Sequence, residues 1–287
     1  MNPTIGVPTI GVFDSGFGGL TVLRELLRHI PQASYKFLGD TARLPYGSKS
    51  RRTIAKYAAE SAQFLVHEQG AQYLVIACNT ASALALDAIQ EAVPVPVLGV
   101  IRPGASAAHA ASKTGDVLVI ATDATIQSHA YAEACQAQGL HGIERACPLL
   151  VPLVEEGWTD HPVTAEIIKI YLDQLQQDAA AASLHPDTLV LGCTHYPLLR
   201  PLIEKIVPAG IRVIDSAEAT AAEAAKLFNL QPATNAGAPG PSHLGTWDGP
   251  TPQIHCFATD SVEKFERLGS RFLGRPTGKV ELVDLGG

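Results

Sequence analysis

The chain carries the stretch LVIACNTAS at residues 74–82 and a variant of it, LVLGCTHYP, at residues 189–197. Each copy is a short apolar run typical of a buried strand, followed at once by a cysteine and then by hydroxyl, amide or imidazole side chains. Two further runs, IGVFDS at 10–15 and VLVIAT at 117–122, are related by a similar offset. Two copies of one strand-helix-strand design, facing each other, would bring the four strand ends together.

Short apolar runs alternate with helix-period stretches through the first hundred residues, which is the pattern of a parallel α/β unit. Pro31 ends the first helix, Ser50 caps the second and Gly70 ends it. The expected strands are 9–13, 34–38 and 72–77, and residues 97–100 form an edge strand or a connection. The expected helices are 19–30, 50–70 and 80–91, with a loop at 39–49.

A second series resembles the first in miniature and ends in a Pro- and Gly-rich segment, 231–252, that we interpret as a loop. Its expected elements are strands at 116–121, 188–192 and 211–214, helices at 125–138 and 217–228, and a further helix after His161 and Pro162. Beyond the loop we expect a strand at 253–258, a helix at 261–268 and a segment of alternating apolar residues at 279–285.

These elements predict two pseudo-symmetric, doubly wound α/β domains with mainly parallel sheets facing each other across a central active-site cleft. We expect the first domain to comprise residues 1–98 plus 210–287, the tail packing back onto the N-terminal unit. The second domain then comprises residues 99–209.

With 287 residues, 46% of them hydrophobic, the chain can form one large core or two modest ones. Its formal net charge of −7 argues against a nucleic-acid scaffold, which presents a basic face. The apolar runs are shorter than the ~18 residues of a membrane helix, and the N-terminal stretch has no secretory pattern. Five cysteines, an odd number, suit free thiols in a reducing compartment. We therefore expect a cytoplasmic protein with small-molecule partners, no nucleic acid and no membrane.

In open α/β sheets ligands bind beyond the carboxyl ends of the strands, where polar residues gather in this sequence. Cys78 and Cys193 each follow a buried strand at the predicted start of a helix, an environment that lowers a thiol pKa from its usual ~8.5. A lone cysteine there is more often a small core residue, but two at corresponding positions predict an acid and base pair. Cys135, Cys147 and Cys256 lack this setting and are interpreted as structural.

Several neighbouring features leave alternatives open. The glycine-rich segment 16–19 lacks the third glycine of a dinucleotide loop, so a tight turn, or backbone amides that hold a carboxylate, explains it better. Cys193 and His195 alone are a weak metal signal, and we predict no metal site. His195 is either a buried core histidine or a proton partner of Cys193. Asp14 can cap the following helix and can polarise Cys78 or a substrate ammonium group, and the two roles are compatible.

Together these motifs resemble those of the cofactor-independent glutamate racemases of bacterial wall synthesis, over nearly the whole chain. The matching segments are IGVFDSGFGG (10–19), DTARLPYG (40–47), ACNTA (77–81), GVIRPG (99–104), CPLLVPLVEEG (147–157), GCTHYP (192–197), ATD (258–260) and LGSRFL (268–273). The resemblance implies an isomerase that interconverts L- and D-glutamate without a cofactor and supplies D-glutamate for peptidoglycan. It also implies a homodimer.

By this resemblance Cys78 and Cys193 are the two acid/base residues, Cys78 for D-glutamate and Cys193 for L-glutamate. Asp14, Glu155 and His195 match the auxiliary acid/base positions, Glu155 better than its neighbour Glu156. The positions that match substrate contacts are Asp14, Ser15, Tyr46, Gly47, Asn79, Thr80, Thr194 and His195. The chemistry fits independently, because a racemase needs two bases on opposite faces of a carbanion-like centre.

Three rival functions remain open. A racemase for aspartate or a hydantoin would use the same two thiols with a different pocket. A two-lobed amino-acid binding protein would need the carboxylate-binding loops but has no use for two thiols. A cysteine hydrolase could use Cys193 and His195, which leaves Cys78 unexplained.

Overall fold

The strands of the computed structural model, which describes residues 7–230 and 252–286, form two separate sheets. They are β1 (Thr9–Asp14), β2 (Ser34–Gly39), β3 (Tyr73–Ile76), β4 (Val97–Gly99), β5 (Asp116–Ala121), β6 (His141–Ala146), β7 (Thr188–Gly192), β8 (Arg212–Asp215), β9 (Ile254–Ala258) and β10 (Val280–Leu282). The first sheet has the order β10-β9-β2-β1-β3-β4 and the second the order β6-β5-β7-β8. Every described pairing is parallel.

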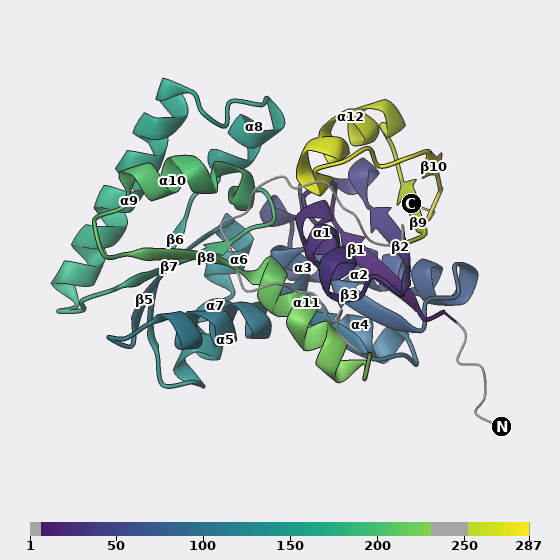
Figure 1. Ribbon diagram of the computed structural model, residues 1–287, viewed down its shortest axis with the longest axis horizontal. Coiled ribbons are helices and arrows are strands. Elements are labelled where there is room, and N and C mark those ends of the chain that lie inside the picture. Colours follow the sequence, from purple (N-terminus) through teal and green to yellow (C-terminus); the bar gives the residue numbers. More distant parts are fainter. Residues whose placement is uncertain (1–6, 231–251, 287) are drawn as a thin grey trace.

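Helices cover both sheets, and the two α/β halves lie side by side (Figure 1). The α-helices are α1 (Leu20–His29), α2 (Arg51–Gln63), α3 (Asn79–Leu84), α4 (Leu86–Ala92), α5 (Ile101–Ala111), α6 (Asp123–Gln127), α7 (Ala130–Gln136), α8 (Leu150–Glu155), α9 (Pro162–Ala181), α10 (Arg200–Ile206), α11 (Ser216–Leu227) and α12 (Val262–Leu273). Short turns of other helix types are η1 (Thr41–Arg43), η2 (Tyr46–Ser48), the π-helical η3 (Phe64–Glu68) and η4 (Tyr196–Leu199). The predicted fold class, two parallel α/β halves, is confirmed.

The repeated sequence motif at residues 74–82 and 189–197 corresponds to a structural repeat of the two sheets. The order β2-β1-β3-β4 in the first half matches β6-β5-β7-β8 in the second, so β3 and β7 hold equivalent positions. Cys78 follows β3 and Cys193 follows β7. The repeat therefore places one cysteine at the same strand end of each half.

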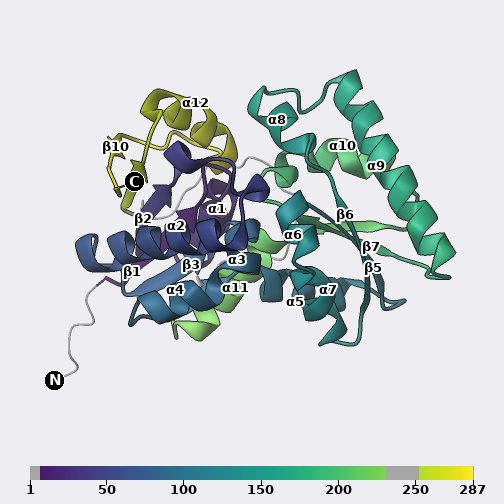
Figure 2. The same cartoon turned by 180° about the vertical axis from the view of Figure 1, so that it is seen from behind.

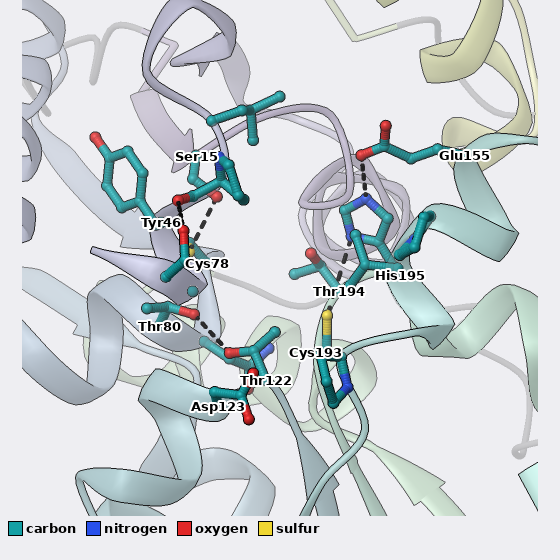
Figure 3. A pocket seen from close by; sticks show the side chains of 18 of the residues that line it. Ser15, Tyr46, Cys78, Thr80, Thr122, Asp123, Glu155, Cys193, Thr194 and His195 are labelled. Carbon is teal, nitrogen blue, oxygen red and sulfur yellow. Dashed lines mark hydrogen bonds and ion pairs between the residues drawn. The ribbon is translucent and has the colours of Figure 1, made fainter.

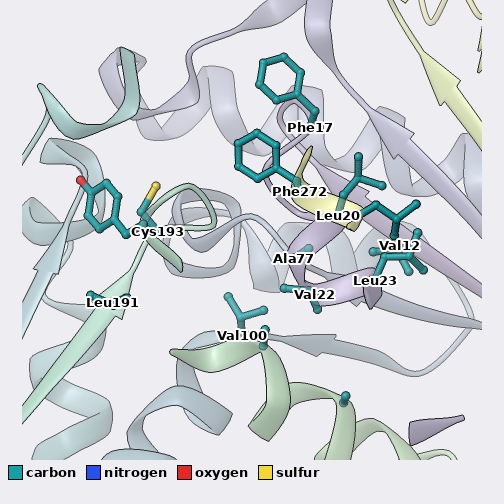
Figure 4. Close-up of a cluster of buried hydrophobic side chains, with 14 of the residues drawn as sticks. Val12, Phe17, Leu20, Val22, Leu23, Ala77, Val100, Leu191, Cys193 and Phe272 are labelled. Atoms are coloured by element: carbon teal, nitrogen blue, oxygen red, sulfur yellow. The ribbon is translucent and has the colours of Figure 1, made fainter. Parts of the chain in front are cut away.

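The strands are buried on both faces, as parallel sheets in α/β proteins require. Val12 and Val75 belong to one apolar cluster, whereas Phe13 and Ile76 belong to another on the opposite face of the first sheet. The first cluster continues into the second half through residues such as Leu191 (Figure 4). Helix α11 packs against α1 of the first half and α5 of the second, so the halves share part of their core (Figure 2).

Three predicted helices differ in length or continuity from the observed ones. The predicted helix 50–70 starts as expected, with Ser50 Oγ accepting the Thr53 amide, but continues beyond Gln63 as the π-helical η3 before Gly70 adopts a positive φ of 69°. The helix at 80–91 is broken at Ala85, and the helix at 125–138 is broken at His129, whose φ is 56°. Apolar periodicity continues across such breaks, so the sequence pattern alone does not locate them.

The last part of the chain follows the prediction in one respect and departs from it in another. β9 pairs with β2, and β10 with β9, so the tail returns to the first sheet as expected. The prediction assigns residues 210–287 to the first domain, but β8 (Arg212–Asp215) pairs with β7 and therefore belongs to the second sheet. The domain division itself stays a prediction, and the Pro- and Gly-rich segment lies, but for Pro252, outside the described residues.

Sequence reasoning missed several elements of the second half, namely α5, β6, α8 and α10. β6 is an edge strand without one fully buried residue, so its sequence, HGIERA, has no apolar run to reveal it. In the part of the chain that the structure covers, no helix is both long and apolar enough to cross a membrane.

Candidate active site

A cavity of about 430 Å³ opens between the two halves, at the carboxyl ends of the strands. This volume is typical of small-molecule sites. Of the predicted site residues it is lined by Ser15, Tyr46, Gly47, Cys78, Asn79, Thr80, Glu155, Cys193, Thr194 and His195. Figure 3 shows Cys78 and Cys193 on opposite sides of it. The structure thus brings together ten of the predicted residues in one pocket, and Asp14 lies buried behind its wall.

Cys78 sits at the N-terminal cap of α3, where its Sγ accepts the Ala81 amide at 3.4 Å. The same sulfur lies 3.4 Å from Ser15 Oγ, to which the thiol donates. The cap follows from the sequence, because the strand β3 ends and the helix starts within two residues. These contacts fix the sulfur at the pocket wall with only 5% of the residue exposed.

The expectation of a lowered thiol pKa is wrong for Cys78. Its pKa rises from 9.0 to about 12, because burial and, second to it, the nearby Asp14 carboxylate raise the pKa by more than the hydrogen bonds with Ser15 and Ala81 lower it. Desolvation disfavours the thiolate more than the start of a six-residue helix favours it. The Cys78 thiol is therefore protonated at neutral pH.

Protein stability is expected to fall as the pH rises above 9, partly because of Cys78. The unfolded thiol loses its proton near pH 9.0 whereas the folded one holds it up to about pH 12, so alkaline pH favours the unfolded state. This one group contributes a loss of about 2 kcal/mol at about pH 10.5. Urea unfolding at about pH 8 and pH 10.5 measures the loss, which should shrink by that amount in Cys78→Ala. An equal loss in both proteins would contradict the buried, protonated thiol.

Asp14 ends β1 and is almost fully buried, with 1% of the residue exposed. Its Oδ2 accepts the Gly16 amide at 2.9 Å, whereas its Oδ1 has no hydrogen-bond partner among the described residues. Burial raises the pKa of this carboxyl, although His195 and the glycine amides oppose the rise. Asp14 therefore holds the glycine-rich loop and adds negative charge behind Cys78, rather than capping α1 with its side chain.

Cys193 has a different neighbour, His195, on its side of the pocket. Its Sγ lies 4.0 Å from His195 Nδ1, and His195 Nε2 lies 3.5 Å from Glu155 Oε1 (Figure 3). The N-terminal cap of the following helical turn, η4, is His195. The turn therefore starts two residues later than the predicted helix start at Cys193. Cys193, His195 and Glu155 form a chain of groups that can pass a proton.

His195 is enclosed by aromatic rings, with Phe272 at 5.1 Å and Phe17 at 5.9 Å between ring centroids. Burial by itself would lower the pKa of His195, but its contacts with Cys193 and Glu155 outweigh this and raise the pKa to about 10. For Glu155, burial raises the carboxyl pKa, whereas His195 and Lys264 lower it by more. The imidazole is therefore positively charged at neutral pH, and Glu155 is negatively charged.

The pocket also joins the two halves through neutral polar groups. The hydroxyls of Thr80, Thr122 and Thr125 lie 3.0–3.2 Å from one another and connect α3 with α6. Asn79 Oδ1 accepts a hydrogen bond from the Tyr131 hydroxyl at 2.7 Å, so its amide NH₂ remains available to a ligand. Such donors bind a carboxylate without a salt bridge.

Tyr46 and Gly47 contribute backbone more than side chain. The Tyr46 hydroxyl is engaged by Asp40, away from the pocket. A Cβ added at Gly47 would lie 3.1 Å from Thr122 Cβ, so this glycine lets the loop approach the second half closely. The substrate contacts at these two positions stay a prediction, and their main-chain groups are the atoms that could make them.

Several residues of the pocket were not among the predicted site residues. Thr122 follows β5, the equivalent of β1, and was signalled by the internal echo, whereas Asp123 is only its neighbour. Lys264, from α12, had no signal in its own sequence neighbourhood. The remaining apolar lining includes Pro148, Val151 and Pro152. Within residues 7–230 and 252–286, no group of three or more His, Cys, Asp or Glu side chains is placed to hold a metal ion.

The comparison with known proteins agrees with this geometry. The family model described as Asp/Glu/Hydantoin racemase matches residues 10–224, which include both pocket cysteines. The chain belongs to this racemase family. The resemblance inferred from the sequence motifs is confirmed, and with it the prediction of an isomerase acting on amino acids.

The individual relatives described next are all named glutamate racemase. A protein of Koribacter versatilis named glutamate racemase is 56% identical, with 98% of each chain covered. A solved structure of a glutamate racemase isoform from Bacillus anthracis has a TM-score of 0.82 at 38% identity, covering 97% of this chain and 98% of the other. A solved glutamate racemase from Francisella tularensis, in complex with D-glutamate, has a TM-score of 0.81 at 34% identity and the same coverage.

Proposed function

We propose that this enzyme interconverts L- and D-glutamate by transferring the α-proton between two thiols. The observation that carries the proposal is the pair Cys78 and Cys193 on opposite sides of one pocket. A base on one face removes the α-proton and an acid on the other face returns one, which inverts the centre. Near-full-length relatives named glutamate racemase support glutamate as the substrate.

The electrostatics of the site support a division of roles between the thiols. The Cys78 pKa of about 12 favours a protonated thiol, and the charged His195 lies 4.0 Å from Cys193 Sγ, where it would stabilise a thiolate. This arrangement suits Cys78 as the acid and Cys193 as the base when L-glutamate is the substrate. After transfer the roles are exchanged, so the product state is ready for D-glutamate.

Backbone and neutral groups would bind the substrate carboxylates. Asn79 and Thr80, which follow Cys78 on α3, offer donors on the Cys78 side of the pocket together with Ser15 and the Tyr46–Gly47 backbone. Thr194 offers a donor on the opposite side, next to Cys193 (Figure 3). Donors that point at a developing carbanion's carboxylate stabilise the charge that builds up in the transition state. The proposed reaction needs no cofactor, because proton removal, charge stabilisation and reprotonation are all assigned to side chains and backbone of this chain.

The biological setting is part of the same proposal. The D-glutamate formed would supply peptidoglycan synthesis in the cytoplasm, and the enzyme would work as a homodimer on a small-molecule substrate. These statements rest on the resemblance of the sequence motifs to bacterial glutamate racemases.

The test is incubation of the purified, cofactor-free protein with L-glutamate in D₂O, followed by proton NMR and circular dichroism. We expect the α-proton signal to disappear and the dichroism to decay to zero, since the enantiomers have equal energy. Aspartate run in parallel measures the specificity. Decay with aspartate alone would assign a different substrate, and no change with folded, reduced protein would refute the proposed activity.

A further inference from the structure

Lys264 belongs to the C-terminal tail of the chain, yet its side chain lines the pocket between the two halves. It lies on α12, which follows β9 of the first sheet, whereas Glu155 ends α8 of the second half. Both helices lie along the same edge of the molecule (Figures 1 and 2), and each contributes residues to the lining of the pocket. Lys264 Nζ bonds Glu155 Oε2 at 3.0 Å, so the ion pair joins the two halves.

The two oxygens of Glu155 are divided between two cations. Oε2 accepts from Lys264 and Oε1 faces His195 Nε2 at 3.5 Å. Glu155 retains 20% of its side-chain exposure, and Lys264 44%. A carboxylate fixed at one oxygen cannot rotate freely, so the ion pair determines where the other oxygen points.

The rest of α12 encloses the same histidine. Phe272, two turns after Lys264, contacts the His195 ring edge-to-face at 5.1 Å. The Lys264 ammonium lies 5.6 Å from the Phe17 ring centroid, and Phe17 is itself packed against His195. The side of the site that holds Cys193 therefore depends on the tail helix, whereas Cys78 is contacted by Ser15, which follows β1, and by Ala81 of α3.

We infer that Lys264 is a positioning residue, which holds Glu155 against His195 and thereby keeps the imidazole in place for proton transfer at Cys193. The inference rests on the proposed function, since it assigns a role within that reaction. Exposed surface ion pairs usually contribute little, but this one orients a carboxylate that faces a buried, charged histidine.

The test is Lys264→Met, which keeps an unbranched side chain of nearly the same length and removes the charge, with Lys264→Arg as the conservative variant. We expect kcat to fall about tenfold in Lys264→Met with KM changed less than about threefold, because positioning of an acid/base group is lost but the group remains. Lys264→Arg should recover most of the rate. The matched control is Lys205→Met, which removes the exposed Lys205–Asp160 pair (3.6 Å) outside the pocket and should leave the kinetics unchanged.

A readout besides the rate separates positioning from a general loss of structure. The two enantiomers have equal energy, so kcat/KM must fall equally in both directions and cannot report which thiol is affected. Primary isotope effects measured with α-deuterated L- and D-glutamate can identify the affected thiol, because each substrate reports the removal of a proton by one thiol. We expect the effect to rise for L-glutamate, whose proton goes to Cys193, and to fall for D-glutamate.

Unchanged isotope effects together with a lower rate, or a rate equal to that of the unmodified enzyme, would overturn the inference. An isotope effect that rises for D-glutamate and falls for L-glutamate would support the positioning role of Lys264. It would also reverse the proposed assignment of the two thiols to the two enantiomers. Absence of racemisation in the unmodified enzyme would instead refute the proposed function itself. Thermal unfolding of all four proteins checks that they fold.

Discussion

Alanine in place of Cys78 or of Cys193 is expected to stop racemisation in both directions, lowering kcat by about 10³-fold or more. One remaining thiol can take the α-proton from one face, but nothing delivers a proton to the opposite face. Removing either residue therefore blocks inversion from L- and from D-glutamate alike. The decay of circular dichroism from each pure enantiomer measures the loss.

The control is Cys135→Ala, since Cys135 is also a fully buried thiol but lies on α7 within the core of the second half, away from the pocket. It should lose some stability and keep its kcat. A refined readout is proton NMR in D₂O, in which Cys193→Ala exchanges the α-proton of D-glutamate slowly while the dichroism persists. Dichroism that decays at the normal rate in either pocket variant would contradict the two-thiol mechanism.

The positions of the two pocket cysteines were predictable from the sequence because they depend on local patterns. A buried parallel strand is a continuous apolar run, and its carboxyl end is marked by the first polar residue. The echo between residues 74–82 and 189–197 then adds the long-range information, since equivalent strand ends in a pseudo-symmetric pair of sheets meet at one cleft. Ser15, Asn79 and Thr194 follow by the same reasoning.

Properties that depend on tertiary burial were not predictable in this way. A thiol at a helix start suggested a lowered pKa, but the sequence does not show that Cys78 is desolvated and faces Asp14. Lys264 lies 109 residues from Glu155 along the chain, on an amphipathic helix whose own pattern only predicts burial of one face. The contacts of such a residue are set by how the tail packs, which local periodicity does not encode.

Gly18→Ala is expected to lower kcat by about 100-fold, although no catalytic group is removed. A Cβ at this position would lie 2.3 Å from Thr194 Oγ1 and 2.7 Å from His195 Nδ1, closer than non-bonded atoms approach. His195 has little room to retreat, because Phe17 and Phe272 enclose its ring. The imidazole must therefore shift away from Cys193 or the glycine loop must move off the second half. Steady-state kinetics with both enantiomers measure the loss.

Gly142→Ala is the matched control, because the nearest atom to its added Cβ is 3.7 Å away and its strand, β6, lies outside the pocket. It should keep both its kcat and its unfolding temperature. Gly18→Ala should also remain folded, since the three atoms nearest to its added methyl group belong to the side chains of Thr194 and His195 and none to the backbone, so that displacement of these two side chains relieves the contacts. A kcat equal to that of the unmodified enzyme would show that proton transfer at Cys193 tolerates a displaced His195. That result would contradict the role assigned to the histidine, because a general acid or base must stay within hydrogen-bond reach of its partner.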